Sequence, residues 1–208
     1  MPLIRRGGGR SPPVEDNGSD PERLLRDGTS DQRWAAARSL AGQPQAVDAL
    51  GGALSTESDA RVREAILTGL ARIGTPASAE AIVPLIRSEK ADVRTAALDA
   101  LRLMPRALEA HLTTLLKDAE PDVRVLACDL ARELPPPVAT RLLCALLAHD
   151  AEANACAAAV EVLAECGEAS ALQALAACAE RFADVPFLVF SANIASERIR
   201  AQAPARDG

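Results

Sequence analysis

The chain has 208 residues, of which 49% are hydrophobic and 25% charged, the balance of a folded protein and not of a disordered one. Aromatic residues make up only 2%, and the alanine- and leucine-rich remainder favours helices over sheets. A net charge of −6 argues against a general binder of nucleic-acid phosphates. No apolar run approaches the ~20 residues that span a bilayer. We therefore expect an all-α, cytoplasmic protein that binds neither nucleic acid nor membrane.

Both ends of the chain lack helical periodicity. Residues 1–20, MPLIRRGGGRSPPVEDNGSD, are rich in Gly, Pro and charge, carry no apolar stretch typical of a secretory signal, and predict a flexible N-terminal arm. Residues 202–208 predict a flexible tail in the same way. The folded domain is therefore expected to cover residues 21–201.

The intervening sequence repeats itself. Val62, Val93 and Val123 align at separations of 31 and 30 residues, and each is followed by an arginine. The unit around Trp34 falls in the same register, whereas the unit after Val123 keeps small residues but loses the Val and the Arg. Self-similarity at this period indicates an array of stacked supersecondary units, whose terminal members are usually atypical.

Each unit divides into two helices. Apolar residues recur at helical spacing from Val93 to Met104, and Pro105 then ends that helix before the next one starts. The same reading of the other units predicts helix pairs at 22–26/31–41, 44–54/59–73, 76–87/91–104, 105–117/121–134, 137–148/150–165 and 168–183/185–200. We therefore expect an α-solenoid of about six stacked antiparallel helix pairs.

The repeated motif resembles a known family. The pattern D-x-R-V-R-x-A-x-x-x-x-L at Asp59–Leu70, with D-V-R-x-A-A-L-x-A-L at Asp92–Leu101 and D-V-R at 122–124, resembles HEAT repeats, in the short form first associated with phycobilisome lyases. The resemblance covers roughly residues 22–200 and implies a solenoid that binds a protein partner. The chain is also similar in size and architecture to small HEAT-repeat proteins that accompany nitrogenase in diazotrophic bacteria. That similarity implies a large metalloenzyme as partner.

Aspartate and arginine recur at fixed positions of the units. The aspartates are Asp31, Asp59, Asp92 and Asp122, and the arginines, here called the arginine column, are Arg33, Arg63, Arg94 and Arg124. Each arginine has an acid nearby, so we interpret the column as ion pairs between repeats together with helix capping. The alternative is a row of arginines that binds anions.

A second set of positions starts one residue after each arginine and continues one and two helical turns beyond. It lies off the apolar face of the second helix of each pair, which lines the concave side in HEAT-like arrays, and it is charged in the middle and apolar toward the C-terminal end. Such a stripe suits a protein partner. The residues that we expect to bind the partner are Trp34, Arg38, Thr68, Thr95, Asp99, Arg102, Val125, Asp129, Arg132 and Val162. The alternative is that Ala155, Ala159 and Val162 belong to the core.

The cysteines and histidines form no recognisable site. Five cysteines, at 128, 144, 156, 166 and 178, show no CxxC and no zinc spacing, so we interpret them as small buried apolar residues and expect neither a metal nor a cofactor. The alternative is that Cys144, Cys156, Cys166 and Cys178 converge on a metal, a cluster or a covalently held chromophore. The surroundings of His111 and His149 suggest no catalytic pair, and we expect no catalytic residue.

The last helix carries half of the aromatic residues. Phe187, Phe190 and Ile194 recur at helical spacing, and we expect them to close the core of the last unit as a cap. If these side chains were exposed instead, they would form a docking surface with Phe anchors.

Together these observations predict a non-enzymatic adaptor or accessory factor that holds a larger protein partner. The similarity to nitrogenase-associated proteins implies a role in assembly, protection or repair of a metalloenzyme such as nitrogenase. The alternative is an enzyme or chaperone of the bilin-lyase type, which the short repeat implies. A third class, the HEAT-like DNA glycosylase, needs a basic groove and base-stacking aromatics, which a chain of net charge −6 with one Trp does not offer.

Overall fold

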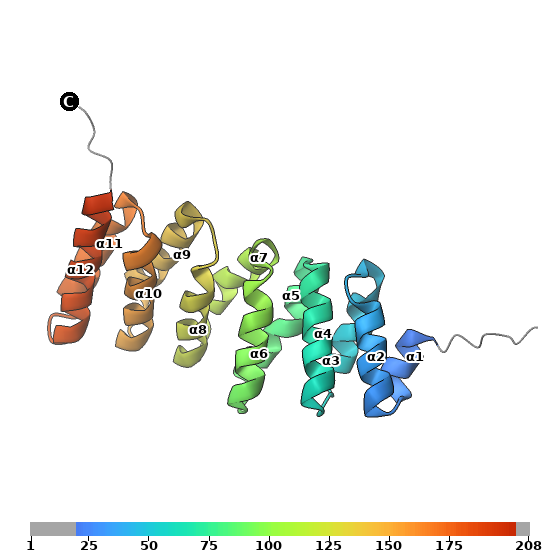
Figure 1. Ribbon diagram of the computed structural model, residues 1–208. Coiled ribbons are helices and arrows are strands. Elements are labelled where there is room, and N and C mark those ends of the chain that lie inside the picture. The colour runs from blue at the N-terminus through green and yellow to red at the C-terminus, as the bar shows by residue number, and fades with distance from the viewer. Residues whose placement is uncertain (1–19, 203–208) are drawn as a thin grey trace, which may run out of the picture.

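The computed structural model describes residues 20–202 and is built from helices, with no strand in this part of the chain (Figure 1). The predicted arm and tail lie outside the described residues, apart from Asp20 and Gln202. The helices are α1 (Pro21–Asp27), α2 (Ser30–Leu40), α3 (Val47–Leu54), α4 (Ala60–Ile73), α5 (Pro76–Ile82), α6 (Ala91–Arg102), α7 (Pro105–Leu115), α8 (Pro121–Ala131), α9 (Pro136–His149), α10 (Ala153–Cys166), α11 (Leu172–Arg181) and α12 (Pro186–Gln202). Three short 3₁₀ segments, η1 (Pro44–Ala46), η2 (Val83–Arg87) and η3 (Ala169–Ala171), lead into or extend them.

Consecutive helices form six pairs that stack into an α-solenoid, as predicted. The even-numbered helices lie side by side in one layer and the odd-numbered helices in a second layer behind it (Figure 1). We call the outer surface of α2, α4, α6, α8, α10 and α12 the even-helix face. Among the described residues, every helix is too short or too polar to cross a lipid bilayer.

Local sequence signals explain where the helices start and stop. Thr29 and Gln32 form a capping box at the start of α2, and the Asp59 carboxylate accepts hydrogen bonds from the first backbone amides of α4. Proline opens many of the helices, where its missing N–H costs nothing. Gly74, with φ of 66°, ends α4 in a left-handed conformation that a side chain disfavours.

One continuous hydrophobic core runs between the two layers, from Leu25 to Ile199. Leucine and isoleucine fill it, and fully buried alanines such as Ala37, Ala97 and Ala127 let neighbouring helices approach closely. No single pair could bury its apolar surface alone, so each pair is stable only between neighbours.

The burial pattern corrects the register of the fifth unit. In α8 the buried residues include Val123, Ala127 and Leu130, and the matching buried residues of α10 come 32 positions later, at Ala155, Ala159 and Val162. The sequence alignment of the units continued the separation of 30 residues into the fifth unit. That alignment placed Ala155, Ala159 and Val162 on the surface stripe. The alternative, that they belong to the core, is the one that the structure supports.

Candidate functional site: the even-helix face

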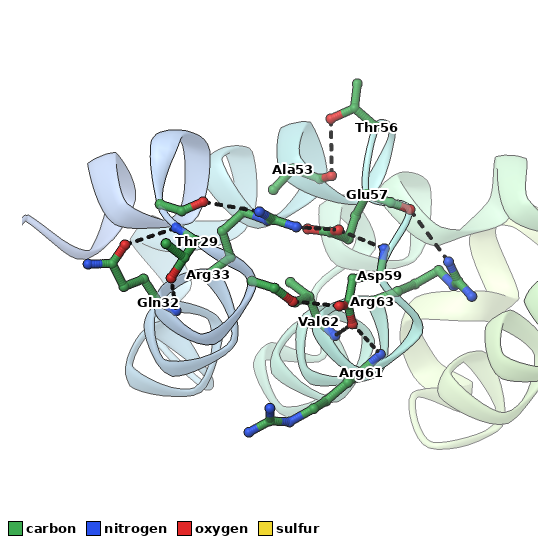
Figure 2. A network of polar contacts seen from close by, with 12 residues as sticks. Thr29, Gln32, Arg33, Ala53, Thr56, Glu57, Asp59, Arg61, Val62 and Arg63 are labelled. Atoms are coloured by element: carbon green, nitrogen blue, oxygen red, sulfur yellow. Dashed lines mark hydrogen bonds and ion pairs between the residues drawn. The ribbon is translucent and has the colours of Figure 1, made fainter.

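The arginine column binds the protein's own backbone. The guanidinium of Arg63 donates to the carbonyl of Glu57, that of Arg94 to Ser88, and that of Arg124 to Asp118, each six residues upstream. Arg33 does the same with the carbonyl of Gly28. Figure 2 shows the guanidinium of Arg33 directed toward Glu57 as well. Each arginine thus stabilises the conformation of the loop that precedes its own helix.

The same arginines also pair with carboxylates of the following unit. Arg33 contacts Glu57 at 2.8 Å, Arg63 contacts Asp92 at 3.3 Å, and Arg124 contacts Asp150 at 2.6 Å. Arg94 makes no ion pair with any described residue and keeps only its carbonyl contacts. The guanidinium groups are therefore occupied within the fold, which supports the structural interpretation of the column over an anion-binding one.

The paired carboxyl groups have perturbed pKa values. The hydrogen bond from Arg33 lowers the pKa of Glu57, and the hydroxyl of Ser30, which donates to Asp59 across 2.5 Å, lowers the pKa of that aspartate. Burial is the largest single effect on Asp150 and raises its pKa, but the hydrogen bonds from Arg124 and from the backbone amide of Glu152, together with the charges of Arg124 and Arg181, outweigh it and the pKa falls. All three carboxyl groups are held ionised, as partners of these contacts must be.

Cys156 occupies the position of the column in the fifth unit. Its thiol points to the carbonyl of Asp150, six residues upstream, as the arginines do. Arg181 reaches over from α11, donates to the carbonyls of Leu147 and Asp150, and contacts the Cys156 sulfur at 3.7 Å. A guanidinium from another helix therefore takes the place of the missing column arginine.

The N-terminal part of the even-helix face is built around Trp34. The guanidinium of Arg61 lies 4.1 Å and that of Arg38 4.7 Å from the centre of its ring. Arg61 is itself held by Asp31 at 2.8 Å. The indole is thus partly covered by cations, which leaves it less apolar surface for a partner than the sequence suggested.

A network of charges spans the middle of the face. Arg102 on α6 joins Asp99 of its own helix to Asp129 on α8, at 2.6 and 2.5 Å. Arg132 continues the network from Asp129 at 3.9 Å to two acids of α10, Glu161 and Glu165, at 3.7 and 3.4 Å. Thr68 and Thr95 lie exposed on the same face. Six of the predicted residues therefore lie at this surface, namely Thr68, Thr95, Asp99, Arg102, Asp129 and Arg132.

The C-terminal end of the face is an apolar groove of about 460 Å³ between α10 and α12. We call it the α10–α12 groove. Phe187 and Phe190 line it with their side chains 68% and 64% exposed, two of the three large apolar residues in the described chain that are so open. The apolar residues that line it are Val125, Ala157, Ala158, Val160, Ala164, Phe187, Phe190 and Ile194.

The groove corrects two expectations. The cap of the last unit is made by Leu188, Ala192 and Ile199, which are buried, whereas Phe187 and Phe190 face outward. Val162, expected on the surface, is 1% exposed and lies out of reach of a partner in this structure.

Sequence reasoning missed part of the groove. With the separation of 32 residues, Val125 of α8 corresponds to Ala157 of α10, and Asp129 corresponds to Glu161. The small residues of α10 permit this match, because Ala155 and Ala159 can take the apolar positions of Val123 and Ala127, but they do not exclude the separation of 30 residues. The other apolar and charged positions of α10 then follow.

The cysteines divide into two groups. Cys128, Cys156 and Cys178 are 0% exposed, whereas Cys144 and Cys166 are partly exposed. Burial raises the pKa of Cys128 to about 12, and a hydrogen bond between Cys156 and Cys178 raises the pKa of the former and lowers that of the latter. Within residues 20–202 no three His, Cys, Asp or Glu side chains are grouped as metal ligands would be.

We expect alkylation of the native protein to follow this division. Iodoacetamide at alkaline pH should modify Cys144 and Cys166 at least about tenfold faster than the three fully buried thiols, which react only when the helices open. Mass spectrometry of timed, quenched digests measures each rate. Equal rates for Cys178 and Cys144 would contradict the burial of the last two units.

The two histidines lie on different helices. The Nε2 atom of His111 on α7 lies 3.2 Å from the carbonyl oxygen of Pro76 on α5, so it links two odd-numbered helices. His149 is exposed at the end of α9.

Three comparisons relate the chain to known proteins. Residues 22–102 match the family described as HEAT repeats. Among solved structures, an engineered protein is 21% identical, covering 87% of this chain and 97% of its own, with a TM-score of 0.44. A designed armadillo repeat protein in complex with the peptide (KR)4 is 17% identical, with coverages of 87% and 99% and a TM-score of 0.45. The complex of CpcE and CpcF of phycocyanin lyase from Nostoc sp. is 17% identical, with coverages of 95% and 100% and a TM-score of 0.39. A search of curated proteins gave no match. The described part of the chain is thus an all-α solenoid, and residues 22–102 of it match the HEAT-repeat family.

Proposed function

We propose that the protein is a non-enzymatic adaptor that binds a protein partner through the even-helix face. The observation that carries this proposal is the α10–α12 groove, into which Phe187 and Phe190 project without a neighbour to cover them. Exposed aromatic side chains that line an apolar groove are the usual anchors of protein interfaces.

The charged network beside the groove supports the same reading. Interfaces combine an apolar centre with a polar rim, and here Glu161 and Arg198 line the groove while Arg132 contacts Glu161 at 3.7 Å. The charges of Asp99, Arg102 and Asp129 extend this rim across α6 and α8. In the proposal the groove supplies most of the affinity and the network supplies register and specificity.

The partner that we propose is a protein larger than this chain. A metalloenzyme such as nitrogenase is the specific candidate implied by the resemblance of the sequence, with a role in assembly, protection or repair. The bilin-lyase alternative would need a chromophore site. Its test is the absorption spectrum of the protein purified from cells that make bilins.

Site-specific photo-crosslinking tests the adaptor proposal directly. A benzoyl-phenylalanine replaces Phe190 in the groove, and the control places the same group at the exposed Ala177 of α11, on the opposite layer. Irradiation in the native host should attach one defined protein to the groove probe alone. Products that are the same for both probes would argue against a binding site on the even-helix face.

Charge reversal tests the rim. The double variant Asp99→Lys/Arg102→Glu should weaken partner binding by about tenfold while helix content stays unchanged, because these side chains lie at the surface. The matched control is Glu109→Lys/Arg141→Glu, an ion pair of 3.9 Å that joins α7 to α9 in the other layer. Binding measured by biolayer interferometry and helix content measured by circular dichroism separate the two effects. Unchanged binding by the first variant would show that α6 lies outside the interface.

A further inference from the structure

The odd-numbered layer has a break in its packing. α3 packs on α5, α5 on α7 and α9 on α11, but α7 and α9 approach each other at few points. In the even-numbered layer α8 packs closely on α10, so the two halves of the solenoid are joined mainly within the α7/α8 pair. The break leaves a space on the side of the molecule away from the even-helix face.

This space is a cavity of about 530 Å³, which we call the α7–α9 cleft. Leu116 at the end of α7, and Leu142 and Leu146 of α9, form its floor with 5–6% of their surface exposed. Ala145, an exposed small residue, leaves room between them. A volume of this size with a mostly apolar floor and a few polar groups is characteristic of small-molecule sites.

The acids of the cleft are already neutralised. Asp118 forms an ion pair with Arg87, and Asp150 accepts two hydrogen bonds from Arg124, at 2.6 and 2.9 Å. Neither carboxylate is therefore free to repel an anion that enters the cleft, although the chain as a whole is acidic.

The cations of the cleft, by contrast, are available. Lys117 makes no ion pair with any residue of the described chain, and Arg141 reaches only the distant Glu109 at 3.9 Å with 67% of its side chain exposed. His149 adds a third nitrogen-bearing side chain at the C-terminal end of α9. The rim thus offers a local excess of positive charge above an apolar floor.

We propose that the α7–α9 cleft binds an aliphatic monocarboxylate of the fatty-acid class. The alkyl chain lies along Leu116, Leu142 and Leu146, and the carboxylate accepts hydrogen bonds from Lys117 and Arg141. A neutral or cationic chain of the same length would leave these cations unpaired, and a carboxylate without a chain would leave the floor uncovered. This site lies on the layer opposite the proposed protein interface and does not depend on it.

Calorimetric titration of the full chain with decanoate, below its micelle concentration, tests the proposal. Decanoate should bind at least about tenfold more tightly than acetate or decyltrimethylammonium, because both the chain and the charge are required. Amide chemical shifts should change around Leu116, Lys117, Leu142, Ala145 and His149. Absence of decanoate binding, equal binding of the cationic probe, or shifts confined to the α10–α12 groove would each overturn it.

Two substitutions locate the site. Ala145→Phe fills the cleft from an exposed helical position and should reduce decanoate binding by at least about tenfold, whereas the control Ala177→Phe on α11 should not. Lys117→Ala/Arg141→Ala should weaken decanoate binding by a similar factor. Full binding by Ala145→Phe would overturn the proposal. So would tight binding of N-acetyl-leucyl-leucine in place of decanoate, which would assign the cleft to the C-terminus of a polypeptide.

Discussion

The variant Arg124→Ala is expected to lower the free energy of unfolding by about 3 kcal/mol or more at neutral pH. Arg124 and Asp150 form a two-point ion pair whose side chains are only 12% and 6% exposed. The same guanidinium donates to the carbonyls of Asp118 and Ala119. Removing it leaves a buried carboxylate without its main partner and releases the loop between α7 and α8.

The pH dependence of this loss has a defined sign. In the native protein Arg124 lowers the pKa of Asp150 against the effect of burial. The pair therefore contributes stability above the unfolded-state pKa of about 4, and the contribution is lost as the pH falls toward the lower folded pKa. In the variant, burial acts without Arg124 and disfavours the charged form. The difference between the two proteins should be largest at neutral pH and shrink below about pH 4.

Arg94 offers a matched control at the same position of the preceding unit. Its guanidinium donates to the carbonyls of Ser88 and Glu89 but pairs with no carboxylate in residues 20–202. Arg94→Ala should therefore cost about 1 kcal/mol, without the pH dependence. Urea unfolding followed by circular dichroism measures both variants across the pH range. Equal losses for the two would mean that the carbonyl contacts, and not the ion pair, stabilise the column.

The repeat could be predicted from sequence because the same physical demand recurs in each unit. Val62, Val93 and Val123 fill equivalent places between the layers, and Pro105 marks the end of a helix whatever surrounds it. The helix pairs predicted from these signals agree with those of the structure within a few residues. A regular array constrains its members so strongly that local periodicity is sufficient.

The register of the fifth unit could not be predicted in this way, because its helices are alanine-rich. In α10 the side chains on both sides of the helix are small, so apolar periodicity does not distinguish the buried Ala155 and Ala159 from the groove residues Ala157 and Ala158. The shift from 30 to 32 residues became visible only through burial. Cys156 stands where the other units have an arginine of the column, so the second feature that marks the register is also missing from this unit.

The last helix posed the opposite difficulty. α12 has two apolar stripes, one with Leu188 and Ile199 and another with Phe187 and Phe190, and helical spacing alone does not say which one faces the array. Because Phe187 and Phe190 have the larger side chains, the sequence analysis placed them in the core. The final unit has a neighbour on one side only, and the space against α10 and α11 accepts the smaller stripe, with Ala192 and Ala195 at the contact.

Replacing both groove phenylalanines, in Phe187→Ser/Phe190→Ser, should reduce partner binding by about a hundredfold or more. Truncation of a central aromatic anchor costs about 2 kcal/mol or more, and 1.4 kcal/mol corresponds to a factor of ten in affinity. The side chains are 68% and 64% exposed in the unbound protein, so thermal unfolding should change little. The measurement is the dissociation constant for the crosslinked partner by biolayer interferometry.

Leu103 provides the control for this effect. It is 72% exposed at the C-terminal end of α6 and does not line the α10–α12 groove. Leu103→Ser removes one exposed apolar side chain outside the groove and should leave partner binding within about twofold, as expected for a contact outside the anchor pocket. If Leu103→Ser weakens binding as much as the double phenylalanine variant, general surface hydrophobicity and not the groove determines affinity. If only the double variant fails, the partner is anchored where α12 ends the solenoid, and the charged network of α6 and α8 then orients the remainder of its surface along the even-helix face.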